Sequence, residues 1–558
     1  MQKLLVIIFS ILFFFILILL FVINLTTYEK FVLETARFIS LKYGNYQQFK
    51  EILSPAVFYR IKICLFILAF LNLIILFLIL FKKNIIKITA NLIKPILLFP
   101  TWIFKSFNKL NKNEKIFLVS VLLIIAIQRF FLSINTSVIY DEAWTYLAFT
   151  SKNPLIAAFF YPASNNHILY SHLTQITKFL PLNILINLRL PAFFIGLFSS
   201  LVFYFCAKQY LKKFGLWIAF LMFSFAFPSV YYGFAARGYS LILLMFIIGF
   251  FAALKIVEGK KKYWYCFSLS SAIGFYTIPV YLYPFVTIIL FLFLSFLANK
   301  NRSEIFHLIK HISLACLLVL ILYLPVFAVS GVQSVTNNKF VQSQDFNIVF
   351  NNFSGHIFKT LKFFTAVEYG FLLVFLIIIL VIYVLIKGKF NNKSILFFSL
   401  LCFLLIPVLV FTHRVVPVER TWIYLLVPLC FMAGKIAELK FVKYLLALVI
   451  IFNLFNISIN WQKQMLWYDN ICEEDYEQGI YFTNYFKNKK VLIVAKNRMN
   501  TYLKFNNKLY KQNWEIHSKM PDKSDRIVYA VYHTSEKNID KNLIKKGYFK
   551  NYYLYCER

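Results

Sequence analysis

Two adjacent carboxylates, Asp141 and Glu142, directly follow a long apolar run and are the residues of this chain best suited to acid–base chemistry. Like charges at the edge of a membrane segment are costly, because they repel each other and because the low dielectric penalises each charge. Acidic residues are also scarce, since Asp and Glu total 23 of 558 residues. The pair therefore indicates a catalytic site, although a solvated loop at the end of a helix explains it equally well.

Further polar residues that could complete such a site are Asn166, His167, Arg189, Arg237, Tyr239 and Arg420. After Asn166 and His167, apolar residues recur at helical spacing from Ile168 to Leu180, which predicts a helix on the membrane surface with Asn166 as its N-cap. A lone arginine near the end of a membrane helix usually extends to water. Several polar groups on the same side as an acidic pair instead favour a binding site.

Composition decides the class of protein. Hydrophobic residues make up 60% of the chain and charged residues 15%, and the mean hydropathy is +0.70, which is typical of a polytopic membrane protein. The formal net charge of +36 could suggest nucleic acid. However, the lysines and arginines lie in short clusters between apolar runs, as in cytoplasmic loops that face anionic lipid head groups. We therefore predict membrane lipids, and no nucleic acid, as partners.

The pattern predicts an all-α polytopic membrane protein with about 13 transmembrane helices and a small C-terminal α/β domain. The expected spans are 3–25, 59–81, 115–133, 183–206, 215–231, 239–257, 264–279, 281–298, 312–330, 369–387, 394–411, 421–436 and 441–460. Lysine clusters between several of these spans assign one side to the cytoplasm. Asp141, the segment 331–368, Arg420 and the chain after about residue 461 then fall on the opposite side.

Three regions follow from this division. Residues 1–114 form a two-span N-terminal extension with a basic interfacial helix at 84–112, residues 115–460 form the transmembrane core, and residues 461–558 form the extracytoplasmic α/β domain. Within the last region we expect strands at 490–495, 526–532 and 552–555, a helix at 538–546, and a disulfide between Cys472 and Cys556. This domain has no catalytic signature, so we treat it as an accessory module.

The order of these elements resembles the GT-C superfamily of polytopic glycosyltransferases, of the protein O-mannosyltransferase and lipid A aminoarabinose-transferase type. In that group an Asp-Glu pair opens the first large outer loop of the core, as Asp141 and Glu142 do here. The later motifs of the group are matched, the last one loosely, by Asn166–Leu169, Leu188–Pro191, Ala236–Tyr239 and Arg420–Pro428. The resemblance covers about residues 115–460. Ile168 departs from it, because mannosyltransferases have proline at this position.

The resemblance implies a membrane glycosyltransferase that transfers a sugar, with inversion, from a polyprenyl-phosphate carrier to a hydroxyl of a lipid, glycan or protein acceptor. It places the enzyme in the inner (plasma) membrane with an extracytoplasmic active site. Asp141 would be the general base, and Glu142 would orient the sugar or the base. No cofactor is implied, and a divalent metal ion is left open.

Arginine suits the carrier phosphate, because its forked donors match the oxygens on which charge develops. Arg237 is the first candidate, and Arg189 or Arg420 is the second. Arg189 could equally form a structural ion pair with the acidic residues. His167 could contact the acceptor or the phosphate, or simply begin an interfacial helix.

A transporter or flippase is the alternative, because such proteins also combine many spans with buried charges. Transporters often contain internal repeats and paired broken helices. The two halves of this sequence show no clear repeat, and the polar groups gather at one membrane face. Both observations favour an enzyme at the interface over a transporter, and over a non-enzymatic assembly protein for which Asp141 would be dispensable.

Overall fold

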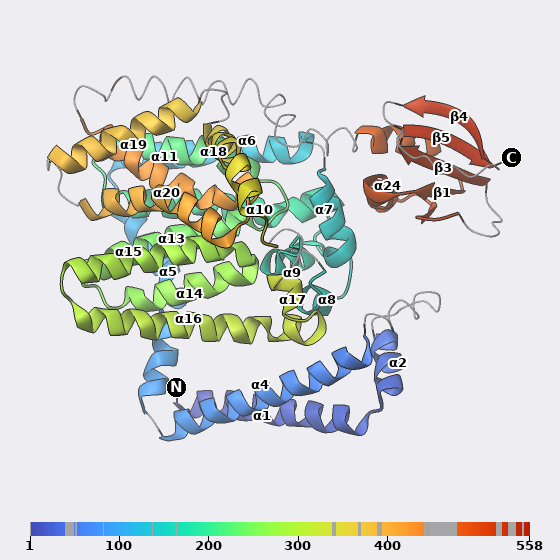
Figure 1. The fold of residues 1–558 in the computed structure, drawn as a ribbon, viewed down its shortest axis with the longest axis horizontal. Helices are drawn as coiled ribbons and strands as arrows, with labels where there is room; N and C mark the ends of the chain where they lie inside the picture. Colours follow the sequence, from blue (N-terminus) through green and yellow to red (C-terminus); the bar gives the residue numbers. More distant parts are fainter. Residues whose placement is uncertain are drawn as a thin grey trace.

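The computed structural model is a bundle of long helices with a small sheet near the C-terminus (Figure 1). It describes residues 2–38, 50, 53–81, 83–136, 138–162, 164–337, 342–365, 370–387, 393–439, 444, 477–520, 527–533, 543–549 and 552–557. Within these residues, seven helices are long and apolar enough to cross a membrane, or eight if one bent pair counts as a single span. The protein is therefore a multi-pass membrane protein, as the composition predicts.

Helices occupy every predicted span except 441–460, which lies outside the described residues apart from Tyr444. The long helices are α1 (Gln2–Leu25), α4 (Pro55–Phe81), α6 (Lys112–Asn135), α10 (Ile184–Ala207), α13 (Tyr239–Val257), α14 (Tyr263–Thr277), α15 (Leu282–Ala298), α16 (Arg302–Val329), α18 (Phe346–Thr365), α19 (Gly370–Lys387) and α20 (Lys393–His413). Two spans are built from shorter pieces, namely α11 (Lys213–Phe225) with α12 (Phe227–Tyr231), and η4 (Glu419–Leu425) with α21 (Leu426–Ile436).

The segment 331–368, predicted only as an outer loop, contains the helix α18, which meets α19 at an angle of 91°. Its inner face buries Val349 and Phe363, whereas Phe350 on its outer face is exposed. The asparagines within this helix interrupt the apolar run, so hydropathy alone does not reveal it. This explains why the sequence did not predict a helix here.

A buried arginine donates hydrogen bonds to both sides of the break between α11 and α12. Arg129 of α6 donates from Nη2 to the carbonyl oxygen of Ser224, at 3.2 Å, and to the hydroxyl of Ser229, at 3.1 Å. The Ser224 carbonyl belongs to the last turn of α11, where intrahelical partners run out and a cation is favourable. Glycine is required beside it, because a Cβ on Gly233 would lie 2.7 Å from Arg129 Nε.

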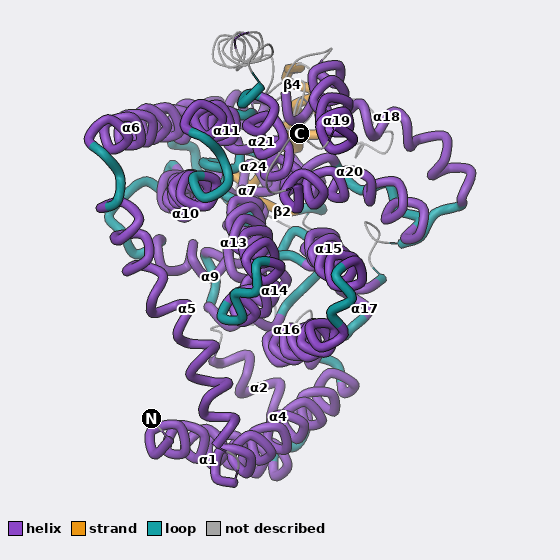
Figure 2. Tube along the Cα trace, turned by 90° about the vertical axis from the view of Figure 1, so that its left-hand side faces the viewer, coloured by secondary structure: helices purple, strands orange, loops and turns teal. Residues whose placement is uncertain are grey.

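The N-terminal helices lie beside the core instead of within it. Figure 2 shows α1 and α4 side by side, with α5 (Lys83–Asn108) running obliquely from them to the core. Aromatic contacts fix the second half of α5, since Phe99 packs against Phe198 and Trp102 against Phe205, with ring centroids 5.8 and 6.1 Å apart. The predicted helix at 84–112 is thus present, and it packs along α10.

The C-terminal domain contains a five-stranded sheet in the order β2-β1-β3-β5-β4. Its strands are β1 (Val491–Ala495), β2 (Glu515–His517), β3 (Ile527–His533), β4 (Leu543–Phe549) and β5 (Tyr552–Glu557). β1 pairs in parallel with β2 and β3, whereas β5 is antiparallel to β3 and β4. One face of the sheet packs on α24 (Asn497–Leu509) through Met499 and Leu503.

The predicted helix at 538–546 is wrong for the residues that are described, because positions 543–549 form β4. Cross-strand contacts with the aromatic residues of β5 explain the difference. Lys545 extends over the ring of Tyr553, with its Nζ 3.6 Å from the ring centroid. Such pairing outweighs a local helical preference. Cys472, and with it the predicted disulfide to Cys556, lies outside the described residues.

Candidate active site

Asp141 and Glu142 lie on α7 (Tyr140–Thr145), a short helix that follows α6 after an extended turn. The Glu142 carboxylate accepts a hydrogen bond from the backbone N–H of Ile139 at 3.1 Å and so fixes the start of the helix. After Thr145 the chain continues as a π-helical turn, η2 (Tyr146–Thr150). Such turns are uncommon and occur frequently at functional sites.

Glu142 is fully buried and forms a bidentate ion pair with Arg189 of α10. Arg189 Nε donates to Oε1 at 3.0 Å, and Nη2 donates to Oε2 at 2.7 Å. Oε1 also accepts from the backbone N–H of Ala236, at 2.6 Å. Each carboxylate oxygen therefore has two donors, counting the Ile139 N–H. Because this set is already complete, Glu142 connects α7, α10 and the turn before α13 instead of facing a ligand.

The other side of Arg189 binds the end of α6. Its Nη1 donates to the carbonyl oxygens of Ser133 and Thr136, both at 2.9 Å. These carbonyls lie at the helix C-terminus, where a cation is favourable. Of the two roles that the sequence left open for Arg189, the geometry favours the structural ion pair.

Asp141 has a different environment, since its side chain is 25% exposed. Its Oδ2 lies 3.4 Å from Arg237 Nη2 and 3.6 Å from Arg420 Nη2, so neither contact has the short, forked geometry of the Glu142 pair. Burial alone would raise the pKa of Asp141, but the positive charges of Arg237, Arg420 and Arg498 outweigh it and lower the pKa below its ordinary value. Asp141 is therefore ionised at neutral pH.

Arg237 is nearly buried and is held by side chains from two segments. It donates to Asn165 Oδ1 and to the Thr145 hydroxyl, the latter at 3.4 Å. Its Nη2 also lies 3.1 Å from His167 Nε2. Asn165, which the sequence did not single out, is thus the residue that orients Arg237.

His167 is surrounded by donors. Its Nδ1 accepts from the backbone N–H of Gly238 at 2.7 Å, while its Nε2 faces Arg237. Burial, together with the charges of Arg237 and Arg420, lowers the pKa of His167 well below its ordinary value, so the ring is neutral. A neutral imidazole has one acceptor nitrogen only. Whichever ring nitrogen carries the proton, one of the two contacts brings two N–H donors together. An anion bound beside Arg237 would accept the ring N–H and remove this unfavourable contact.

Two aromatic contacts complete the cluster. The ring of Tyr239 lies edge-on to His167, with centroids 5.2 Å apart, and the Arg420 guanidinium lies 5.9 Å from the Tyr239 ring centroid. Glycine at 238 permits the close approach of His167, because a Cβ there would lie 3.1 Å from His167 Cβ and 2.7 Å from Thr277 Cγ2. The structure thus brings Asp141, His167 and Arg420 together with Arg237 and Tyr239.

Asn166 does not join this cluster. Its Nδ2 donates to the carbonyl oxygens of Ala157 and Phe160, at 2.9 and 3.0 Å, and its Oδ1 accepts from the Ser171 hydroxyl. The N-cap of α9 (Ile168–Thr177) is His167 and not Asn166, so that prediction is wrong by one residue. Asn166 instead fastens the end of α8 (Pro154–Phe159) to α9.

The C-terminal domain contacts the candidate site through α24, which faces α7 in Figure 1. Tyr502 and Phe505 of α24 are buried against Val138 and Ala143. The guanidinium of Arg498 lies 5.6 Å from the ring centroid of Tyr140. Its charge also lowers the pKa of Asp141. No local motif could have identified Arg498, because the contact depends on how two distant segments pack.

The charges of three guanidinium groups, those of Arg237, Arg420 and Arg498, therefore act on one carboxylate at this site. Glu142 does not offset them, because Arg189 already neutralises it. Guanidinium groups are donors that suit a dianionic ligand such as a phosphate. Among the residues that the structure describes, no three His, Cys, Asp or Glu side chains gather as a metal-binding set.

The fold is similar to that of ArnT from Cupriavidus metallidurans. Its crystal structure in the apo state superposes with a TM-score of 0.50 at 11% sequence identity, over 79% of this chain and 97% of ArnT. The crystal structure of the same protein bound to undecaprenyl phosphate gives a TM-score of 0.48 at 12% identity, with the same coverage. No protein-family model and no curated protein sequence matches the chain. The chain thus has the ArnT-like polytopic fold that the sequence predicts.

Proposed function

We propose that this protein is a membrane glycosyltransferase that transfers a sugar from a polyprenyl-phosphate carrier to an acceptor hydroxyl. The observation that carries the proposal is the environment of Asp141, a partly exposed, ionised carboxylate beside the guanidinium groups of Arg237 and Arg420 on an ArnT-like fold. A general base and an anion site are the two parts that such a transfer needs.

In the proposed reaction, the acceptor oxygen attacks the anomeric carbon from the side opposite the phosphate. The bond from that carbon to the phosphate oxygen breaks, its electron pair stays on the phosphate, and the configuration inverts. Asp141 accepts the proton of the acceptor hydroxyl. Its lowered pKa makes it a weak base, so the proton moves late, once bonding to carbon has made the hydroxyl strongly acidic.

Arg237 and Arg420 would bind the carrier phosphate and stabilise the charge that it gains on leaving. The contacts of Arg237 with Asn165 and Thr145 fix its direction in advance, which lowers the reorganisation needed during the reaction. A phosphate oxygen beside His167 Nε2 would accept a hydrogen bond from the ring and resolve the donor–donor contact described above.

We propose that the candidate site faces the extracytoplasmic side of the plasma membrane. The support is the distribution of lysines, which gather in the loops at the other ends of the same helices. Reporter fusions after Lys213 and Lys262 should therefore read cytoplasmic, whereas a fusion after Asn488 should read extracytoplasmic. A cytoplasmic signal at Asn488 would separate the C-terminal domain from the proposed catalytic side and contradict its contact with α7.

The reaction class can be tested directly. Mass spectrometry of surface glycans and lipids from a deletion strain should identify a missing sugar, and the purified protein should restore it from the polyprenyl-phosphate sugar but not from a sugar nucleotide. NMR of the product should show an inverted anomeric centre. Transfer with a sugar nucleotide alone, or with retained configuration, would contradict the proposal.

A further inference from the structure

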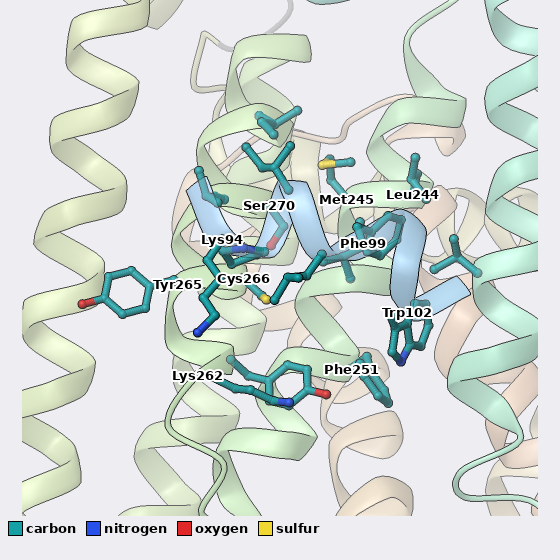
Figure 3. Close-up of a pocket in the computed structure, with 18 of the residues that line it drawn as sticks. Lys94, Phe99, Trp102, Leu244, Met245, Phe251, Lys262, Tyr265, Cys266 and Ser270 are labelled. Carbon is teal, nitrogen blue, oxygen red and sulfur yellow. The ribbon is translucent and has the colours of Figure 1, made fainter. Parts of the chain in front are cut away.

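A cavity of about 600 Å³ lies between α5, α10, α13 and α14 (Figure 3). Its volume is within the range of small-molecule pockets, about 300–1,000 Å³. Tyr239, at the start of α13, belongs to the candidate active site, whereas the cavity reaches Lys261 and Lys262, just beyond the other end of this helix. A helix of 19 residues is about 28 Å long. The end of the cavity at Lys261 and Lys262 is thus nearly a membrane thickness away from the candidate site.

The walls of the cavity are mainly apolar. Phe99 and Trp102 come from α5, Phe198 from α10, and Met245 and Phe251 from α13. A hydrocarbon chain would gain free energy by covering such a surface, whereas a water-soluble metabolite would not. The cavity therefore has the lining expected for the chain of a lipid.

The charged groups that line the cavity are all lysines, and they stand beside the polar side chains of Asn91, Tyr263, Tyr265 and Ser270. Lys94, Lys261 and Lys262 all line it, and none of its lining residues, all of which lie in the described part of the chain, is acidic. Lys261 is 73% exposed, and its Nζ is 4.0 Å from the carboxylate of Glu304, so it remains largely uncompensated. An anionic head group would therefore be attracted to this end of the cavity.

We infer that this cavity binds an anionic glycerophospholipid, with its phosphate at Lys94, Lys261 and Lys262 and an acyl chain between α5 and the core. A zwitterionic lipid would bring its own cation to the lysines, and free phosphate would leave the apolar walls uncovered. Because α5 forms one wall and joins the core to the N-terminal helices, the bound lipid would also hold α5 in place. The inference is independent of the proposed transfer reaction.

The test uses the full-length protein in lipid nanodiscs or detergent. Native mass spectrometry with phosphatidylglycerol and phosphatidylcholine measures which lipid stays bound. The wild type should retain phosphatidylglycerol at least about tenfold better than phosphatidylcholine, and changing Lys94, Lys261 and Lys262 together to Gln should remove this preference. A matched variant with Lys109→Gln, Lys112→Gln and Lys212→Gln, which changes three exposed lysines in other loops of the same face, should keep it.

A second variant, Cys266→Trp, fills the cavity without removing a charge and should also prevent retention of the lipid. It keeps the inference testable if the triple variant does not fold. If the triple lysine variant or Cys266→Trp retained as much phosphatidylglycerol as the wild type, the inference would be overturned. So would its displacement by inorganic phosphate, or by polyprenyl phosphate alone, since the first would mean a simple anion site and the second a site for the carrier.

Discussion

Asp141 and Glu142 are neighbours in the chain, yet they lie in opposite environments. Glu142 is buried in a bidentate ion pair with Arg189, and each of its oxygens accepts two hydrogen bonds. Asp141 is partly exposed and has only longer contacts with Arg237 and Arg420. Successive residues of a helix point about 100° apart, so one turn of α7 can direct one carboxylate inward and the other to the opening. The comparison indicates that Glu142 holds the site together, whereas Asp141 is available for chemistry.

Breaking the buried ion pair between Glu142 and Arg189 should have the largest effect on stability. Glu142→Gln leaves the buried guanidinium of Arg189 without its charge partner, which should lower the free energy of unfolding by about 3–5 kcal/mol. The expected result is a lower Tm in detergent and less protein in the membrane. The control is Glu34→Gln, because Glu34 belongs to an exposed ion pair with Arg37 and should change stability by less than about 1 kcal/mol. An unchanged Tm for Glu142→Gln would contradict the structural role of Glu142.

Arg237→Lys tests the partly exposed surroundings of Asp141. Lysine keeps the charge but cannot make the forked contact with phosphate oxygens, so transfer should fall about 100-fold while membrane abundance stays normal. Arg302→Lys, at the exposed start of α16, is the matched control. A variant with reduced abundance and normal activity per molecule would instead assign Arg237 a structural role.

Arg498→Gln tests the contribution of the C-terminal domain and should have a smaller effect, about tenfold on transfer. Loss of this cation should raise the pKa of Asp141, so the activity should disappear at a higher pH as the solution is acidified. The control is Lys508→Gln, an exposed change on the same helix. If the transfer rate of both variants fell at the same low pH as that of the wild type, Arg498 would not act on Asp141.

Features that depend on neighbouring residues could be predicted from the sequence. The apolar runs predicted the spans, and the local motifs around Asp141, His167, Arg237 and Arg420 predicted which residues meet. Features that depend on tertiary packing could not. Asn165 and Asn166 differ in role only because the turn before α9 directs one side chain to Arg237 and the other to α8.

The same limit applies to the charged residues. The sequence left open whether Arg189 pairs with an acid or binds phosphate, and only the packing of α6, α7 and α10 decides between them. Arg498 reaches the site through α24, so no spacing along the chain links it to Asp141. The error at 543–549 has a similar cause, since pairing with β5 overrides the local preference of a lysine-rich segment.

The central claim is that Asp141 accepts the proton of the acceptor. The most direct measurement is single-turnover transfer by Asp141→Asn, with the polyprenyl-phosphate sugar already bound, against wild type and Asp345→Asn. Asp345 is an exposed residue whose side chain accepts a backbone N–H at the start of α18, a role that Asn also fulfils. The account predicts a loss of about 1,000-fold for Asp141→Asn, with unchanged Tm and carrier binding, and full activity for the control. Transfer by Asp141→Asn within about twofold of wild type would contradict it, because an amide cannot accept the proton.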